Sequence, residues 1–345
     1  MKKYQHTGIV LAQILTLLLL AGSILSWCIS FVPPTEGHFW GIIALGTPVG
    51  IAANFFALIF WILLRRWSYV LLPIIALVFN LEYIISTFQF SFPKHEQADL
   101  IVGTLNVDNF LWQGEAQPCI DQCLEVARRE QLDVFCLQEY TSVSKIPLDS
   151  IALSFASYLP YASFDQGEAI LSRHPIVRSK YERFPDSGND YLWADIALGK
   201  DTVRIISVHF QTSGISALRA QYEKTEEGKA PLSEVLGTLE KNNRKRATQA
   251  FDIREMIDAT PYPLVVMGDF NDTPSSYTYR RVKNNLVDGF RQAGNGFART
   301  FRGLFDFLRI DFIFYEELFY ATDYKILEDN LSDHRMVTAS LKFDR

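Results

Sequence analysis

The chain has 345 residues and a formal net charge of −6 at pH 7, enough for one large domain or two ordinary ones, without the broad basic surface of a non-specific nucleic-acid binder. Its four cysteines are too few for a disulfide framework. The charge is unevenly spread: residues 1–90 hold four basic and two acidic side chains, a net of +2, which leaves −8 for the remainder. This asymmetry indicates a membrane part joined to an acidic soluble part.

Three apolar segments open the chain, each about as long as the ~20 residues that cross the hydrocarbon core of a bilayer. They cover about residues 8–32, 39–64 and 69–90, and Glu82 is the one charged residue within them. We predict three transmembrane helices in a membrane domain of residues 1–92. A cleaved signal peptide is the alternative for the first segment, but Trp27 is bulky where a cleavage site needs a small residue.

Basic residues next to these segments predict the orientation in the membrane. Lys2 and Lys3 precede the first segment, Arg65 and Arg66 lie between the second and third, and the loop 33–38 has neither Lys nor Arg. The positive-inside rule then places the N-terminus in the cytoplasm. After three crossings, the rest of the chain lies on the extracytoplasmic side of a bacterial-type inner membrane.

From Ala98 onward, short apolar runs alternate with helical patterns, which predicts an α/β domain. Strands are predicted at 100–105, 134–137, 169–172, 193–198, 203–208, 264–267, 310–314 and 336–341, and helices at 118–131 and 246–257. Residues 213–243 form a polar excursion interrupted by Gly228 and Pro231, to which the sequence assigns no role. Roughly eight residues separate the third apolar segment from the first of these strands, a reach of at most ~25–30 Å.

The strand 264–267 stops at Gly268 and is followed by Asp269 and Asn271. Two residues apart on an extended chain, these side chains project the same way. A carboxylate can accept a proton from water, and an amide can donate to an anionic oxygen; hydrolysis of a phosphate ester needs both. By itself, however, this pattern also fits a turn that Asp269 merely caps.

Polar side chains recur at the ends of the other predicted strands. They are Asn106, Glu139 and His209, which follow apolar runs, and Asp333 and His334, which precede the last run. Each has an ordinary structural explanation when taken alone. Their recurrence at strand ends predicts a shared site, because sheets present functional groups there.

Seven short motifs follow one another along the chain. They are Thr104-Leu105-Asn106-Val107, the run 133–139 ending in Leu137-Gln138-Glu139, the run 170–176 containing Ser172-Arg173-His174-Pro175, Ser207-Val208-His209, Gly268-Asp269-Phe270-Asn271, Arg309-Ile310-Asp311-Phe312-Ile313 and Ser332-Asp333-His334. Together they resemble the ordered motifs of the endonuclease/exonuclease/phosphatase family. That family includes deoxyribonucleases, abasic-site endonucleases, sphingomyelinases and inositol-polyphosphate 5-phosphatases. The resemblance implies a four-layer α/β/β/α sandwich for residues 93–345.

The same resemblance implies a metal site. Glu139 matches the principal metal ligand of the family, with Asn106 beside it, and Asp108 and Asp333 are further candidate ligands. Carboxylate and amide oxygens suit Mg²⁺, with Mn²⁺ as the alternative ion.

The resemblance also assigns catalytic roles. His334 matches the histidine that contacts the scissile phosphate, and Asp311 the carboxylate that holds its imidazolium. Asp269 would orient or deprotonate the attacking water, and Asn271 would fix Asp269 in place or bond the phosphate. His209 matches a second phosphate-stabilising histidine.

The leading hypothesis is a membrane-anchored, Mg²⁺-dependent phosphoesterase that cleaves phosphodiester or phosphomonoester bonds. Its partners would be the lipid bilayer and a phosphate-ester substrate, either a nucleic acid or a phospholipid headgroup; the sequence leaves the choice and the oligomeric state open. Glu168 stands where the family often has Asn or Leu, and we expect it to place extra negative charge near the substrate. The alternatives are a catalytically silent binding domain on the same fold and a transporter with an appended domain.

Overall fold

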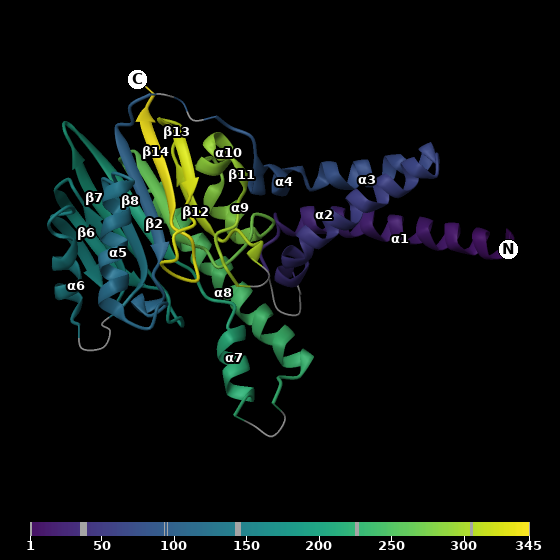
Figure 1. The fold of residues 1–345 in the computed structure, drawn as a ribbon, viewed down its shortest axis with the longest axis horizontal. Helices are drawn as coiled ribbons and strands as arrows, with labels where there is room; N and C mark the ends of the chain where they lie inside the picture. Colours follow the sequence, from purple (N-terminus) through teal and green to yellow (C-terminus); the bar gives the residue numbers. More distant parts are fainter. Residues whose placement is uncertain are drawn as a thin grey trace. The chain divides into compact units, whose positions relative to one another are not determined.

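The computed structural model describes residues 2–34, 40–92, 94, 96–141, 146–224, 228–303 and 306–344, which form two compact units (Figure 1). The first, here called the membrane unit, comprises the chain up to Ile85 together with Gly214–Ala247 and Pro274–Arg280. The second, here called the sheet unit, comprises Ser86–Ser213, Thr248–Thr273 and the chain from Arg281. Phe39, Pro93 and Arg345, which bound predicted segments, lie outside the described residues.

The membrane unit begins with four helices: α1 (Lys2–Ile29), α2 (Trp40–Leu63), α3 (Trp67–Phe79) and α4 (Leu81–Thr87). Thr7–Ile29 and Trp40–Leu63, with mean hydropathies of 2.3 and 2.0, are long and apolar enough to cross a membrane. The α3–α4 pair is bent by 60°, as in a broken span or a re-entrant loop. The described residues therefore offer two spans, or three if the bent pair counts as one.

The third predicted segment is thus a bent pair of helices, where the sequence predicted one helix over 69–90. The break falls at Asn80, whose Nδ2 donates to the carbonyl of Ala76 at 2.9 Å. A side chain that bonds the backbone one turn earlier competes with the helical ladder and favours a bend. The chain leaves the helix at Thr87 and continues as strand β1 (Phe88–Gln89).

Polar side chains join α1 to α2. The hydrogen bonds are Ser26 to Thr47 at 2.6 Å, Asn54 to Ser23 at 3.1 Å and Trp61 to Thr16 at 2.9 Å. Apolar surfaces gain little by packing together in lipid, so small residues and hydrogen bonds of this kind are what hold membrane helices together. The same unit contains α7 (Ile215–Tyr222) and the first part of α8 (Leu232–Asp258).

The sheet unit contains two six-stranded sheets. One runs in the order β13 (Phe319–Ile326), β14 (Val337–Phe343), β2 (Leu100–Asn106), β3 (Val134–Tyr140), β5 (Gly167–Ser172) and β4 (Tyr161–Asp165). The other runs in the order β10 (Val287–Asp288), β12 (Asp311–Tyr315), β9 (Leu264–Asp269), β8 (Asp201–His209), β7 (Asp190–Leu198) and β6 (Ile176–Arg183). The remaining elements are the 3-10 turn η1 (Asp108–Phe110), α5 (Ala116–Arg129), α6 (Leu148–Phe155), α9 (Tyr277–Lys283), α10 (Gly289–Ala293) and β11 (Gly296–Phe297).

Strand alternation builds the layers. Every second residue of β2, such as Val102, joins a core shared with residues of the other sheet, such as Ile205 and Val265. The opposite face of β3, including Phe135, packs under α5 and α6. Outward-facing residues of the second sheet, such as Phe314, are also fully buried. The predicted α/β sandwich of two packed sheets with flanking helices is confirmed.

The chain enters the sheet unit earlier than the sequence predicted. The carbonyl of Ser86 accepts a hydrogen bond from Arg309 Nη1 at 2.6 Å, and that of Thr87 accepts from Ala298 N at 2.7 Å. Strand β1 pairs with β11, Phe88 opposite Phe297. Between β1 and β2, the described residues 90–92, 94 and 96–99 lie in neither a helix nor a strand.

Candidate active site

Strand register gathers the predicted site at one end of the two sheets. Parallel pairing of β2 and β3 places Asn106 beside the end of β3 that carries Glu139. Parallel pairing of β8 and β9 places His209 opposite Asp269, and antiparallel β12 adds Asp311 on the other side of Asp269. These side chains, dispersed along the sequence, therefore share one site.

Asn106 lies between two carboxylates. Its Nδ2 donates to Glu139 Oε1 and to Asp269 Oδ2, both at 3.1 Å. Its Oδ1 accepts from the backbone N of Asp108 at 3.0 Å, which leaves this oxygen a second lone pair. Asn106 thus positions the predicted base and the predicted principal metal ligand together.

Asp269 is held by the turn that follows it. Asn271, at φ 49°, donates from its backbone N to Asp269 Oδ1 at 2.8 Å and from Nδ2 to Oδ2 at 3.1 Å. Just before Asp269, strand β9 requires Gly268, at φ 140°, because a Cβ there would meet the carbonyl oxygen of Val208 in β8 at 2.1 Å. Of the two roles predicted for Asn271, this geometry favours fixing Asp269 in place.

His334 forms a buried cluster with two aspartates. Its Nδ1 lies 3.0 Å from Asp311 Oδ2, and its Nε2 lies 3.7 Å from Asp269 Oδ2. Burial alone would lower the pKa of His334, but Asp311 and then Asp269 raise it to about 10. Burial raises the pKa of Asp269 to about 6. A protonated imidazole therefore lies beside a carboxylate whose affinity for a proton is increased.

His209 occupies the opposite side of Asp269. Its Nε2 lies 3.8 Å from both Glu139 Oε1 and Asp269 Oδ2, and it is buried without a hydrogen-bond partner in the described part of the chain. Burial lowers the pKa of His209, which favours the neutral ring. A neutral imidazole with an uncommitted ring nitrogen can donate to a phosphate oxygen.

The predicted metal ligands form an oxygen-rich group. Burial and the neighbouring carboxylates of Asp333 and Glu139 raise the pKa of Asp108 to about 6, so three acidic groups share this region. Within the described part of the chain, the side chain of Glu139 accepts amide hydrogens from Asn106 at 3.1 Å and Asn109 at 3.2 Å. Such a set of carboxylate and amide oxygens fits a hard divalent cation.

A second group, Asp269, Asp311 and His334, also brings potential ligand atoms within 4.8 Å of one another. Its geometry alone would admit a metal ion. In that cluster, however, His334 Nδ1 is engaged with Asp311 at 3.0 Å, which leaves Nε2 to face a ligand. The residues predicted to hold the cation are instead the oxygen ligands Glu139, Asn106, Asp108 and Asp333, here called the Glu139 group.

Sequence reasoning missed Asn109 and Thr141. Asn109 donates to Glu139 Oε2 and accepts from Thr141 Oγ1 at 2.6 Å, so both residues fix the orientation of Glu139. Asn109 lies in a turn of consecutive positive φ angles, from Asp108 (43°) to Phe110 (57°). Asp and Asn tolerate positive φ angles, so the pair Asp108-Asn109 could have indicated such a turn. The pair does not indicate which carboxylate the amide of Asn109 contacts.

Glu168 does not face the substrate side, contrary to expectation. It is fully buried between the sheets, where Ser207 Oγ donates to its Oε2. Burial and then the nearby Asp190 hold the pKa of Glu168 well above its usual range, which favours the neutral acid. Gln138 donates to Ser207 at 2.9 Å. Glu168 thus belongs to a polar layer beneath the site.

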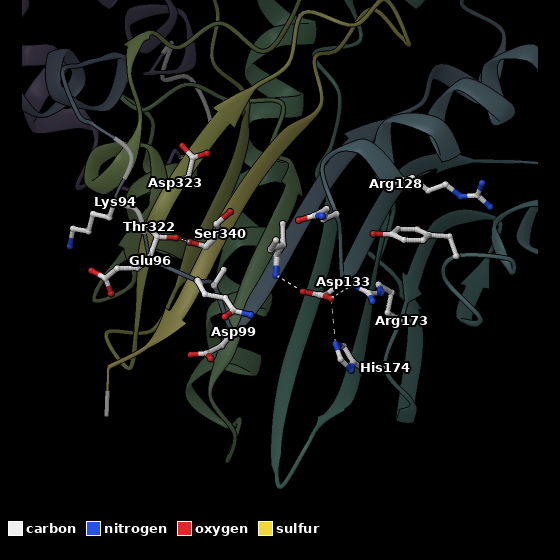
Figure 2. Close-up of a pocket in the computed structure, with 15 residues that line it drawn as sticks. Lys94, Glu96, Asp99, Arg128, Asp133, Arg173, His174, Thr322, Asp323 and Ser340 are labelled. Atoms are coloured by element: carbon white, nitrogen blue, oxygen red, sulfur yellow. Dashed lines mark hydrogen bonds and ion pairs between the residues drawn. The ribbon is translucent and has the colours of Figure 1, made fainter.

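An open hollow of about 770 Å³ lies at the other end of the first sheet (Figure 2). It is lined by residues at the amino ends of β2 and β3, whereas Asn106 and Glu139 lie at the carboxyl ends. Its Asp133 is engaged by Arg173 at 3.1 Å and by the backbone N of Ile101 at 2.9 Å, with His174 at 3.6 Å. We assign it no catalytic role.

The sequence matches the model of the endonuclease/exonuclease/phosphatase family over residues 103–334, and the chain belongs to this family. Residues 9–87 match a domain of unknown function, DUF8431. A search of curated proteins gives no match.

Solved structures share the fold of the sheet unit. A family member from Bacteroides thetaiotaomicron aligns with a TM-score of 0.53 at 18% identity, covering 71% of this chain and 98% of that one. One from Leptotrichia buccalis gives 0.52 at 16% identity, and a mannosyl-6-phosphatase from B. thetaiotaomicron gives 0.51 at 17%, each covering 71% of this chain and 100% of the other. At these identities the likeness establishes the fold alone.

Proposed function

We propose that this protein is a membrane-anchored, Mg²⁺-dependent phosphoesterase. The observation that carries the proposal is the contact of a protonated His334 with Asp269, while Asn106 bonds both Asp269 and the metal-binding Glu139. The proposed general base is thus hydrogen-bonded through Asn106 to a proposed cation ligand, and the proposed phosphate donor lies 3.7 Å from that base. A silent binding domain would not need all three, so the intact group supports catalysis over that alternative.

Asp269 is the proposed general base. Asn271 and Asn106 fix its two oxygens, so the carboxylate is oriented before water arrives. His334, oriented by Asp311, donates a hydrogen bond to a phosphate oxygen as negative charge develops there, and neutral His209 donates a second. The protein residues thereby activate water and stabilise the pentavalent phosphorus centre.

Glu139, Asn106, Asp108 and Asp333 would hold the cation. Bound Mg²⁺, with Mn²⁺ as a substitute, would supply positive charge to the phosphate and to the leaving oxygen. Asn109 and Thr141 keep Glu139 in the orientation that this binding needs.

His334→Ala and Asp311→Ala are each expected to lower kcat by at least ~10²-fold, because the imidazolium and the carboxylate that orients it act as one unit. The double variant should lose little more than either single one. Steady-state kinetics on bis-nitrophenyl phosphate measures all three. Losses that multiply in the double variant would show that the two residues act independently.

We further propose that the substrate is a phosphate ester at the membrane surface, such as a phospholipid headgroup. The support is the direct succession of α4, which ends at Thr87, and β1, which begins at Phe88, together with the acidic charge of the chain after residue 90, which disfavours polyanion binding. By the positive-inside rule, the active site lies on the extracytoplasmic side. The test is a reporter fused to the C-terminus that is active only in the cytoplasm. Reporter activity in cells would contradict this orientation.

Full-length protein in liposomes tests the substrate. Lipid in the same vesicles as the enzyme should be cleaved at least ~10-fold faster than lipid in separate vesicles, because anchoring raises only the effective concentration of substrate in the same bilayer. Candidate lipids are sphingomyelin and phosphatidylinositol phosphates. Soluble bis-nitrophenyl phosphate should be cleaved equally in both preparations, which controls for the amount of active enzyme.

DNA in solution is the competing substrate. Equal rates on lipid in the same and in separate vesicles, or a strong preference for DNA, would contradict the lipid proposal. A nuclease would then be the better assignment for the same active site.

A further inference from the structure

Four polar side chains lie fully buried between the two sheets of the sheet unit. We call them the polar layer: Thr104 in β2, Gln138 in β3, Glu168 in β5 and Ser207 in β8. Each lies two positions along its strand from a residue of the apolar core between the sheets, namely Val102, Cys136, Ile170 and Ile205. Side chains two apart on a strand share a face, so the polar layer continues the stacked core in the direction of the active site.

The polar layer is one continuous chain of hydrogen bonds. Thr104 Oγ1 donates to Gln138 Oε1 at 3.1 Å, Gln138 Nε2 donates to Ser207 Oγ at 2.9 Å, and Ser207 Oγ donates to Glu168 Oε2. Ser207 belongs to the second sheet, whereas the other three residues belong to the first. Two side chains of the first sheet therefore hold the same hydroxyl group of the second.

This cross-sheet link lies directly below the active site. Gln138 precedes Glu139 in the sequence, and Ser207 precedes His209 by two residues on the same face of β8. His209 in turn lies opposite Asp269 in the register of β8 and β9. The bond between Gln138 and Ser207 thus joins the strand that carries a proposed cation ligand to the strand that carries a proposed phosphate donor.

Stability alone does not require polar groups at these positions. Buried polar side chains cost free energy unless they are hydrogen-bonded, and apolar side chains of the same shape can replace a bonded pair with little loss. A bonded polar network, in contrast, restricts how two surfaces can pack, because its bonds form in few geometries. The polar layer therefore fits a role in fixing the spacing of the sheets at the site.

Glu168 is the terminal acceptor of the chain. It leaves Ser207 free to accept from Gln138, because the proton of the Ser207 hydroxyl group is directed to Glu168. Burial and then Asp190 hold the pKa of Glu168 well above its usual range, so the neutral acid is favoured. A glutamine has the same shape as this neutral acid and keeps an oxygen that accepts from Ser207.

We propose that Glu168 is a positioning residue for the reaction. By accepting from Ser207 it keeps Ser207 bonded to Gln138, and this link holds His209 and Asp269 at a fixed distance from Glu139. Glu168 acts only through these residues and does not contact the substrate. This inference rests on the proposed phosphoesterase activity.

The test uses full-length protein in lipid nanodiscs with soluble bis-nitrophenyl phosphate. Glu168→Leu and Ser207→Ala should each lower kcat by ~10- to 100-fold, since small displacements of catalytic groups have effects of this size. The Mg²⁺ concentration for half-maximal activity should change less than ~2-fold, because neither variant alters a ligand of the Glu139 group. Glu168→Gln should retain at least about half of the wild-type kcat, because its amide oxygen still accepts from Ser207.

Two comparisons separate positioning from general destabilisation. Glu168→Leu combined with Ser207→Ala should be no slower than the slower single variant, because both changes break the same link. Ile170→Ala is the matched control: Ile170 is fully buried two residues from Glu168 on the same face of β5, so its loss weakens the core without breaking the link. The kcat of folded Ile170→Ala should equal that of the wild type.

Several results would overturn the proposal. They are a wild-type kcat in folded Glu168→Leu, a Glu168→Gln variant as slow as Glu168→Leu, and an equal loss of kcat in Ile170→Ala. Losses that multiply in the double variant would also overturn it. If Glu168→Leu does not fold, Ser207→Ala takes its place in each comparison with Glu168→Gln.

Hydrogen exchange supplies a readout that is independent of turnover. Amides of residues 207–210 should exchange at least ~10-fold faster in Glu168→Leu or Ser207→Ala than in the wild type, because the end of β8 is no longer held to the first sheet. Amides of β13 should be unchanged, and Glu168→Gln should match the wild type. Wild-type protein without turnover on any ester would count against the proposed function, whereas unchanged exchange at 207–210 would overturn the positioning role of Glu168.

Discussion

Asp269→Asn is expected to lower kcat by at least ~10²-fold while the protein remains folded, because an amide cannot accept the proton of the attacking water. The substitution preserves shape and keeps one oxygen, which can accept either from the backbone N of Asn271, as Oδ1 does, or from the side chains of Asn271 and Asn106, as Oδ2 does. Rapid-mixing measurement of the first turnover on bis-nitrophenyl phosphate isolates the chemical step. Asp165→Asn is the matched control, since Asp165 is exposed and, among the residues that the structure describes, its side chain accepts from the backbone N of Gln166.

The pH profile tests the same assignment. Burial raises the pKa of Asp269 to about 6, and a base must be ionised to act, so kcat/KM should rise with pH through about 6. His334, with a pKa of about 10, stays protonated over this range and adds no change. Asp108, whose pKa is also raised to about 6, is kept ionised by measuring at saturating Mg²⁺, and the rise should then be absent in the residual activity of Asp269→Asn. If kcat/KM of the wild type does not change between about pH 5 and 7, Asp269 is not the base.

The structure brings together residues that the sequence proposed for one site, but several of their contacts were not predicted. Strand ends could be recognised from apolar runs, and register then brought Asn106, His209 and Asp269 together, because parallel strands end at the same edge. Asn109 was not predicted, since its contact with Glu139 depends on a turn of positive φ angles rather than on periodicity. Local sequence patterns predict strands. The contact of a turn residue with a side chain on another strand depends on tertiary packing.

Glu168 and Glu82 illustrate the same limit. Glu168 is followed by an apolar run, and a run without alternation does not indicate which residues face inward. The register with β3 places the side chain of Glu168 between the sheets, where it is fully buried. The partner of Glu82, Arg280, lies 198 positions away in the sequence. No local pattern predicts a pair at that separation, so the role of Glu82 became visible only with the fold.

Removing the divalent cation is expected to abolish turnover, and adding back Mg²⁺ or Mn²⁺ should restore it. The reason is the donor set: burial and then the neighbouring carboxylates of Asp333 and Glu139 raise the pKa of Asp108, and oxygen ligands of this kind select hard cations. Excess EDTA followed by titration of each metal measures the effect. Full activity in EDTA would reject the metal assignment, and recovery with Zn²⁺ alone would reject the assigned ion.

Glu139→Gln separates metal binding from chemistry. The variant keeps an oxygen for one amide hydrogen bond but loses the negative charge, so the Mg²⁺ concentration for half-maximal activity should rise by at least ~10-fold. High Mg²⁺ should recover part of kcat, because Asp269 and His334 remain in place. Asp269→Asn should show the reverse pattern, with a lowered kcat at every Mg²⁺ concentration and little change in the half-maximal value. If added Mg²⁺ recovers Asp269→Asn but not Glu139→Gln, the roles of the two carboxylates are exchanged.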